Sequence, residues 1–333
     1  MSFNNRHIDQ QRAPVGVLVM AYGTPAGLEQ VETYYTHIRH GRRPTPELLA
    51  DLQNRYQAIG GVSPLLEHTR TQINGMQTAL DALAPGQFRT ILGMKHVPPF
   101  IEESVAELAR DGVQRIIGLV LAPHYSSMSV GEYIQRARAA LPASLPFSAI
   151  ESWHLVPGYV AYLTEQVLNV KTRMFQVSGI PEEKLEVLFT AHSLPERILS
   201  MGDPYPGQLQ ETAEAVAKAA QLRRWSVAWQ SAGRTTEPWI GPSILEVLQE
   251  LPSRGVEGVV VCPAGFVSDH LEVLYDLDIE ASRLAAAQHL AFARTALPNN
   301  DPRFLAVLAE MIRIHLEQAE KIEMPSRKLC KDG

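Results

Sequence analysis

Two stretches of the chain decide the fold: Gly16-Val-Leu-Val-Met-Ala-Tyr-Gly-Thr-Pro25 and Glu186-Val-Leu-Phe-Thr-Ala-His-Ser-Leu-Pro195. Each is an apolar run that ends in Ala and is followed by an aromatic polar residue and a short turn to proline. Such a run bounded by a turn is typical of a buried strand. A second pair of similar segments, 118–124 and 259–264, follows later in each half. The repetition predicts two similar half-chains.

Helical patterns alternate with these apolar runs, which indicates an α/β fold with parallel sheets covered by helices on both faces. We predict strands at residues 15–20, 88–93, 115–121, 147–152, 185–190, 225–229 and 258–262. The predicted helices are residues 46–58, 64–82, 98–110, 129–139, 159–176, 207–220, 242–251, 268–286 and 303–319. We therefore expect two doubly wound domains, 14–156 and 157–322, facing a central cleft, with a last helix able to pack back on the first domain. Residues 1–13 and 323–333 form polar tails.

Charge and cysteine content restrict the class of protein. The 333 residues carry 30 Lys and Arg against 36 Asp and Glu, a net charge of −6, which argues against a nucleic-acid-coating surface. The two cysteines, Cys262 and Cys330, cannot form a four-cysteine zinc site or iron–sulfur cluster within one chain. The polar start lacks the apolar core of a signal peptide, and no apolar run approaches the roughly 20 residues of a membrane helix. We expect a cytoplasmic protein with no transmembrane segment and no nucleic-acid partner.

Ligands of doubly wound sheets bind at the carboxyl ends of strands, where Tyr22 and His192 lie. A lone histidine in a turn can also be a packed, hydrogen-bonded residue, but this position favours a functional role. Glu272, Asp276 and Glu280 are spaced i, i+4 and i+8, so a helix would align their carboxylates on one face. The alternatives are a solvated acidic face and a path for a hydrated divalent cation, because oxygen ligands suit hard ions.

Basic and aromatic residues cluster near the start of the chain despite the negative net charge. Arg39 and Arg55 interleave with Tyr35 and Tyr56. Guanidinium groups bind carboxylates and stack on rings, so the pattern suits a flat aromatic ligand that carries carboxylates. No glycine-rich nucleotide fingerprint follows a strand, so the fold does not imply a dinucleotide.

The sequence resembles the ferrochelatases, most closely those of the coproporphyrin branch. Between about residues 15 and 285 the resemblance is carried, in family order, by LVMAYGTP, YYTHIRHGRRP, RYQAIGGVSPL, GMKHVPPFIEE, LAPHYSSMSVGEY, TAHSLPERI, GDPYPGQL, WQSAGRTTEPWIGP and PAGFVSDHLEVLYDLDIE. It implies the class II chelatase fold, two Rossmann-like domains around a porphyrin cleft.

The resemblance also implies roles for individual residues. The family's metal site falls on His192 and Glu272, with Asp276 and Glu280 on a path outward. Its porphyrin-binding positions fall on Tyr22, Arg39, Arg55, Tyr56, Ser63 and Tyr133. Tyr22 favours the coproporphyrin branch, where this tyrosine ligates iron in the product.

The implied activity is insertion of Fe2+ into coproporphyrin III to form coproheme in haem biosynthesis, with iron as a substrate, no organic cofactor and no iron–sulfur cluster. We expect a monomer that hands its product to a coproheme decarboxylase. Two alternative activities are ferrochelatase action on protoporphyrin IX and insertion of Co2+ or Ni2+ into another tetrapyrrole by a related class II chelatase. A tetrapyrrole-binding protein without enzymatic activity is the third alternative, although it has no need of the His192–Glu272 pair.

Overall fold

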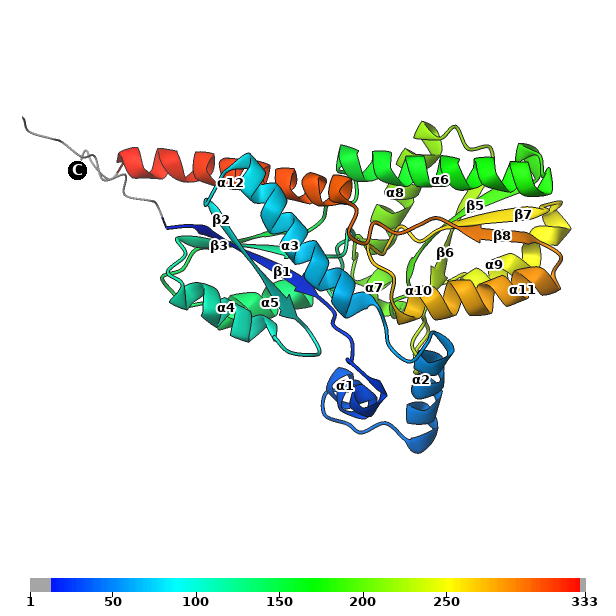
Figure 1. Cartoon of the computed structure of the whole chain (residues 1–333), viewed down its shortest axis with the longest axis horizontal. Helices are drawn as coiled ribbons and strands as arrows, with labels where there is room; N and C mark the ends of the chain where they lie inside the picture. The colour runs from blue at the N-terminus through cyan, green and yellow to red at the C-terminus, as the bar shows by residue number, and fades with distance from the viewer. Residues whose placement is uncertain (1–12, 330–333) are drawn as a thin grey trace, which may run out of the picture.

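The computed structural model describes residues 13–329, with side chains described to residue 321. It contains two four-stranded parallel sheets, of order β2-β1-β3-β4 and β6-β5-β7-β8, which lie side by side (Figure 1). The strands are β1 Val15–Ala21, β2 Phe88–Met94, β3 Arg115–Val120, β4 Phe147–Ile150, β5 Leu185–His192, β6 Trp225–Gln230, β7 Gly258–Cys262 and β8 Ala291–Arg294. The two sheets thus have the same topology, which confirms the predicted α/β class and explains the internal repeat.

Helices flank both sheets and connect the parallel strands. They are α1 Val31–Ile38, α2 Pro46–Ala58, α3 Leu65–Leu83, α4 Ile101–Arg110, α5 Val130–Ala140, α6 Pro157–Ser178, α7 Arg197–Ser200, α8 Tyr205–Ala219, α9 Ile244–Glu250, α10 Leu271–Tyr275, α11 Ser282–Ala287 and α12 Pro302–Leu329. Short 3-10 turns occupy Leu28–Gln30, Glu182–Lys184 and Leu251–Arg254, and a π-helix, η4, spans Asp276–Ala281. No helix among residues 13–329 has the length and apolar character needed to cross a membrane.

Helix α7 was not predicted, and α12 continues to Leu329, past its predicted end at residue 319. Three further features differ from the sequence-based expectation. Residues 268–286 do not form one regular helix, because the π-helix η4 separates α10 from α11. Strand β8 was not predicted, since Ala-Phe-Ala-Arg is short and only half-buried at the edge of its sheet. The third feature is α1, which has only two buried residues and was also missed.

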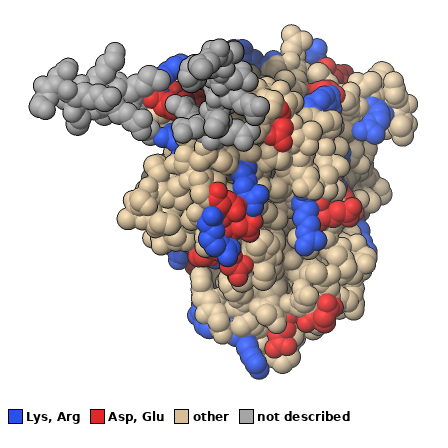
Figure 2. Space-filling model, turned by 60° about the vertical axis from the view of Figure 1, so that its left-hand side comes forward, with Lys and Arg blue, Asp and Glu red and all other residues tan. Residues whose placement is uncertain are grey.

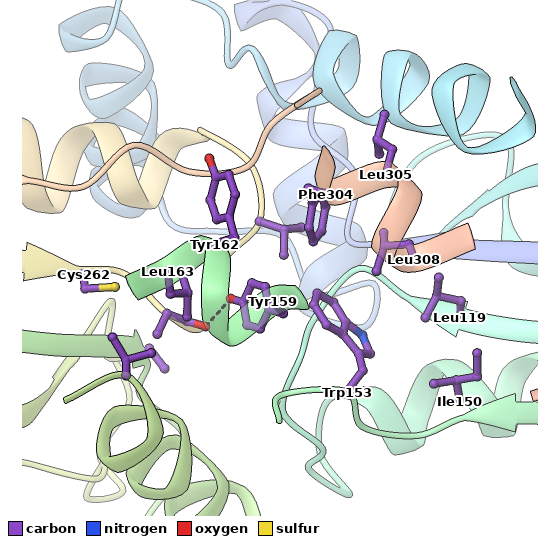
Figure 3. Close-up of a cluster of buried hydrophobic side chains, with 14 of the residues drawn as sticks. Leu119, Ile150, Trp153, Tyr159, Tyr162, Leu163, Cys262, Phe304, Leu305 and Leu308 are labelled. Carbon is purple, nitrogen blue, oxygen red and sulfur yellow. Dashed lines mark hydrogen bonds between the residues drawn. The ribbon is translucent and has the colours of Figure 1, made fainter. Parts of the chain in front are cut away.

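One hydrophobic core joins the two halves. Trp153 and Tyr159 pack edge to face with ring centroids 4.9 Å apart, and Phe304 at the start of α12 packs on both rings (Figure 3). The same cluster includes Leu119 of β3 and Cys262 of β7. Because aromatic side chains bury large apolar areas, this cluster holds the second half against the first.

Helix α12 crosses back over the first half of the molecule and lies along α3 (Figure 1). His315 on α12 bonds through Nε2 to Oγ of Ser148 on β4, at 2.9 Å. On the opposite side, α1 and α2 project from the junction of the two halves, and α2 contacts α10. We call α1, α2 and their connections, residues 25–64, the α1–α2 lobe.

Charged side chains of both signs are mixed over the surface. In the view of Figure 2, Lys and Arg lie beside Asp and Glu, and the described residues form no continuous basic surface on this face. This distribution agrees with the net charge of −6.

Candidate metal and porphyrin site

The ends of the two central strands place Tyr22 and His192. Strand β1 ends at Ala21, and Tyr22 is followed by Gly23, which adopts φ 88°. A Cβ at Gly23 would lie 2.6 Å from the Val97 side chain, so this turn requires glycine. Strand β5 ends at His192 itself. The repeated pattern of strand, aromatic polar residue and turn thus presents one such residue from each sheet.

His192 faces Glu272, the second residue of α10. Nε2 of His192 lies 3.4 Å from Oε1 of Glu272, and 32% and 38% of the two side chains are exposed. Nδ1 of His192 contacts the carbonyl oxygen of Ser193. A carbonyl oxygen only accepts, so Nδ1 carries a hydrogen and the Nε2 position faces the carboxylate. Only a proton or a cation between Nε2 and Oε1 makes this contact favourable.

The electrostatics of the pair agree with that geometry. Burial lowers the pKa of the His192 imidazole, but the charge and hydrogen bond of Glu272 oppose burial and raise the pKa to about 9. Burial likewise raises the pKa of Glu272, but the two imidazoles of His192 and His270 reverse the effect and hold it below its ordinary value. A neutral imidazole and a carboxylate are also metal ligands. With bonds of roughly 2.1 Å, as for zinc, and a tetrahedral angle, two such donors lie about 3.4 Å apart.

His270 is a neighbour of this pair that the sequence interpretation missed. Its Nδ1 donates to the carbonyl oxygen of Ser268 at 2.9 Å, and its Nε2 lies 3.5 Å from Oε2 of Glu272. Each oxygen of Glu272 therefore faces one imidazole. The adjacent letters of Asp269-His270-Leu271-Glu272 contained this signal, since His270 precedes Glu272 by two residues at a helix start. The described residues contain no group of three or more His, Cys, Asp and Glu side chains arranged for a metal ion.

Asp276 does not lie on a solvated acidic face. It is 6% exposed at the start of the π-helix η4, and one of its carboxylate oxygens accepts a hydrogen bond from Ser231. Burial is the main reason that its pKa is raised to about 6, and the charges of Glu272 and Glu280 raise it further. The three carboxylates therefore do influence one another, although the helix that carries them is not a regular α-helix.

Arg55 and Arg39 occupy different environments. Arg55 on α2 reaches across to the second half, where its Nη1 lies 3.6 Å from Oδ1 of Asp276 and its guanidinium lies over the ring of Tyr275, 4.8 Å from the centroid. Its Nε is 3.3 Å from Asp51. Arg39 follows α1, lies 5.7 Å from the ring centroid of Tyr35, and makes no ion pair with any described residue. The Nε atoms of Arg39 and Arg55 are both buried without a hydrogen-bond partner.

Four tyrosines of the first half surround the same space as Glu272. Burial is the main cause of the raised pKa of each, and the negative charge of Glu272 adds to it for Tyr22, Tyr34, Tyr56 and Tyr133. The pKa of Tyr56 rises to about 12, and its hydroxyl lies 3.2 Å from Oγ1 of Thr24. Tyr22 is 41% exposed although protein surrounds most of its ring. Its exposed part is available to a ligand in that space.

The remaining expected residues, Ser63 and Tyr133, lie on the first half. Oγ of Ser63 accepts from the backbone N–H of Leu65 at 3.3 Å, at the start of α3, next to a recess of about 480 Å3. Tyr133 on α5 is buried beneath Lys95, whose Nζ lies 5.1 Å from the ring centroid. Ser63 belongs to the α1–α2 lobe, and Tyr133 is near enough to Glu272 for that charge to raise its pKa.

Trp239 is a second residue that the sequence interpretation missed. Its ring lies 6.3 Å from that of His192, and its Nε1 donates to Oγ1 of Thr235 at 2.8 Å. Trp239 is in the WQSAGRTTEPWIGP segment that carried part of the resemblance, but nothing in the spacing assigned it a contact.

Other candidates lie outside the site. Cys262 is fully buried, and burial raises the pKa of its thiol to about 12, which agrees with an inert residue; Cys330 lies outside the described residues. An apolar recess of about 670 Å3 between α6 and α8 is lined by none of the expected site residues. It holds no acid or base pair, so we place the chemistry at His192 and Glu272.

The fold and this site define a class of protein with two similar parallel sheets and an imidazole–carboxylate pair at strand ends. Two solved structures share the fold: CbiX, the terminal enzyme for biosynthesis of siroheme in denitrifying bacteria, and SirB from Bacillus subtilis with Fe3+. The TM-scores are 0.51 and 0.50, with 15% and 14% identity, and the matches cover 90% of this chain and 98% and 94% of those chains.

Sequence comparison identifies the family within that class. The ferrochelatase family model matches residues 14–316. The chain is 44% identical over 308 residues to coproporphyrin III ferrochelatase of Anoxybacillus flavithermus, covering 91% of this chain and 97% of that protein. It is 43% identical over 310 residues to the protein of the same name from Halalkalibacterium halodurans, covering 92% and 98%. The chain belongs to the ferrochelatase family.

Proposed function

We propose that this protein inserts Fe2+ into coproporphyrin III and so forms coproheme in haem biosynthesis. The observation that carries the proposal is the His192–Glu272 pair, whose carboxylate is near enough to raise the pKa of Tyr22, in a chain 44% identical to a coproporphyrin III ferrochelatase. The reaction exchanges one Fe2+ for two pyrrole N–H protons, so it needs a metal-guiding group and a proton acceptor but no redox step.

His192 and Glu272 fit both requirements. In the metal-free protein the raised pKa of His192 keeps a proton on the imidazole at neutral pH. An arriving Fe2+ displaces that proton, because metal ligation requires neutral imidazole. The displaced proton leaves to solvent, and the imidazole and carboxylate hold the ion loosely enough to release it to the porphyrin. Once the ion has left, their freed lone pairs accept the two pyrrole protons as general bases.

Asp276 and Glu280 extend the line of acidic groups away from Glu272. Their charges act on one another through the site, and Oδ1 of Asp276 is buried without a hydrogen-bond partner. Carboxylate oxygens suit a hydrated divalent ion. We therefore assign to these two residues the route by which Fe2+ reaches Glu272.

Arg39 and Arg55 would bind the propionate groups of the porphyrin. The buried Nε of Arg39 has no hydrogen-bond partner and is a donor that a carboxylate could satisfy, whereas the Nε of Arg55 would exchange its ion pair with Asp51 for one with the propionate. Tyr56, Ser63 and Tyr133 belong to the same half of the molecule and would line the macrocycle. Tyr22 follows a strand of one sheet and His192 ends a strand of the other, and we assign to the phenolate of Tyr22 the ligation of ferric iron in the product from the face away from His192.

The deciding experiment is anaerobic incubation of the purified protein with Fe2+ and either coproporphyrin III or protoporphyrin IX, followed by absorbance. We expect turnover with coproporphyrin III and much slower turnover with protoporphyrin IX. Preference for protoporphyrin IX, or for Co2+ or Ni2+ over Fe2+, would contradict the assignment. Absence of turnover with every pair, together with porphyrin binding, would indicate a binding protein.

Two variants test the assignment of the pair. His192→Ala should abolish insertion and leave porphyrin binding largely intact, because the arginines hold the propionates. His289→Asn is the matched control, since His289 is exposed and adopts φ 57°, which asparagine tolerates. Unimpaired turnover by His192→Ala would refute the catalytic role.

A monomeric state, a cytoplasmic location and product transfer to a coproheme decarboxylase are further parts of the proposal that rest on sequence. Sedimentation of the protein tests the monomeric state, and cell fractionation tests the cytoplasmic location. Mixing the coproheme-loaded protein with the decarboxylase in the presence of excess free apoprotein checks the third, because direct transfer would resist the trap.

A further inference from the structure

The ring of Tyr22 is held by His96, a residue with no role in the site described above. The two ring centroids lie 4.5 Å apart at 56°, and the backbone N–H of His96 donates to the carbonyl oxygen of Tyr22 at 3.1 Å. The neighbouring N–H of Lys95 donates to Ala21 at 2.9 Å. Strand pairing thus continues past the ends of β1 and β2, and His96 cannot shift without moving Tyr22.

His96 is itself fixed by His37 on α1. Nδ1 of His96 lies 3.0 Å from Nδ1 of His37, and His96 is buried. Two imidazole nitrogens at this distance share one hydrogen, so one ring must donate and the other accept. The tautomers of His37 and His96 are therefore coupled.

Aromatic neighbours hold both histidines in place. Tyr34 meets the ring of His96 edge-on, with centroids 6.4 Å apart, and its hydroxyl donates to the carbonyl oxygen of Gly23 at 3.1 Å. His37 stacks on Phe100 with centroids 5.4 Å apart at 20°. The cluster joins α1 to the turn after β1 and to the start of α4, around the ring of Tyr22.

We infer that His96 is a positioning residue for Tyr22, and that His37 sets the orientation and tautomer of His96. This inference rests on the proposed role of Tyr22 as the ligand of ferric iron. If His37 fixes the orientation of His96, then His96 keeps the Tyr22 ring in the geometry that iron ligation requires, and the ring need not reorganise when iron is bound. Loss of the contact between His96 and Tyr22 should weaken the iron–phenolate bond while the rest of the porphyrin site stays intact.

The test compares the affinity of each variant for ferric coproporphyrin III with its affinity for metal-free coproporphyrin III, measured by absorbance titration. His37→Ala removes the partner of His96 from the half-exposed α1, and His96→Phe keeps ring packing on Tyr22 but removes both nitrogens. We expect about a tenfold loss of affinity for the ferric form, equal to about 1.4 kcal/mol, with affinity for the metal-free form unchanged. The absorption of the iron–phenolate bond should weaken in parallel.

Two further variants complete the experiment. His37→Asn retains a hydrogen-bonding group and should restore most of the ferric affinity. His40→Asn is the matched control, because His40 is an exposed histidine in the same lobe, adopts φ 54° and should change neither affinity. Circular dichroism confirms that each variant is folded.

Equal weakening of both ligands by His37→Ala and His96→Phe would show a merely structural role and overturn the inference. The inference would also be overturned if His37→Ala and His96→Phe both bind ferric coproporphyrin III as tightly as the wild type while Tyr22→Phe binds it more weakly. If Tyr22→Phe itself leaves the ferric affinity unchanged, the ligand role of Tyr22 fails, and the inference fails with it.

Discussion

Replacing Arg39 and replacing Arg55 should have different consequences, although both residues are proposed to bind substrate carboxylates. Arg39 makes no ion pair within the described part of the chain, and its Nε is buried without a hydrogen-bond partner. A propionate bound there gains a new charge-assisted bond, worth about 1.5–3 kcal/mol. Arg39→Ala should therefore raise the dissociation constant for coproporphyrin III by about 10- to 150-fold.

Arg55 must first give up internal partners. Its contacts with Asp51 and Asp276 are 3.3 and 3.6 Å long, and Asp51 also pairs with Arg234 at 3.0 Å. Exchanging partly exposed ion pairs of this kind costs up to about 1 kcal/mol. The net gain from a propionate falls to about 0.5–2 kcal/mol. Arg55→Ala should then raise the dissociation constant by only roughly 2- to 30-fold.

The two variants should also differ in stability. Arg55→Ala leaves the buried carboxylate of Asp276 without its cation and should destabilise the protein by about 1–3 kcal/mol at pH 8. The pKa of Asp276 is already raised above its ordinary value of 3.8, to about 6. This raised pKa stabilises the fold below about pH 4, and the contribution is lost as the pH rises through 6. Loss of Arg55 raises the pKa further, so the deficit should be larger at pH 8 than at pH 5.

Titration of metal-free coproporphyrin III gives the dissociation constants, and thermal unfolding at pH 5 and pH 8 gives the stabilities. Adding Asp276→Asn to Arg55→Ala is the control, and it should remove most of the pH dependence. Equal effects of the two arginine variants on binding, with no difference in unfolding temperature, would refute the distinction between a free and an internally paired arginine.

Three further predictions concern the reaction and its substrate. Glu272→Gln should slow iron insertion by about 10²-fold, which anaerobic kinetics measures. The pKa of His192 should fall from about 9 to 6.5 or below, because burial then acts unopposed, and NMR titration of the metal-free protein measures it. An insertion rate equal to that of the wild type would contradict the pairing. Tyr22→Phe should retain insertion but alter the absorption spectrum of bound ferric coproheme, and an identical spectrum would exclude ligation. Raising the salt concentration from 0.05 to 0.5 M should weaken the binding of coproporphyrin III to the wild-type protein, since salt screens exposed ion pairs. The same change should have little effect on binding to the Arg39→Ala, Arg55→Ala double variant. An equal salt effect on both proteins would show that the propionates bind elsewhere.

Local patterns in the sequence were sufficient to predict most of the strands and most of the helices. Seven of the eight strands begin where the apolar runs begin, because a strand buried on both faces needs continuous apolar side chains whatever packs on it. The repeat around Tyr22 and His192 likewise predicted two similar halves, and the structure shows two sheets with the same topology. The strand that was missed, β8, is a half-buried edge strand whose residues carry little of that signal.

Tertiary structure decided the shape of the acidic segment and the partners of its side chains. We predicted one helix over residues 268–286, yet a π-helix begins at Asp276, where the carboxylate is buried against Ser231 and Arg55. Burying a carboxylate is costly without a partner. The partners come from a loop and a helix far away in the sequence, so no local window contains them.

The sequence by itself therefore determined the α/β architecture and the residues at the strand ends, because apolar periodicity and turn residues act over a few positions. The family followed separately, from the resemblance of its motifs to those of the ferrochelatases. Only the tertiary structure decided that Arg55 pairs with Asp276, that His270 faces Glu272 and that His37 and His96 hold Tyr22. These contacts depend on how the α1–α2 lobe and the loops at the strand ends fold against one another. Distances of about 3 Å between side chains follow from that packing and not from spacing along the chain.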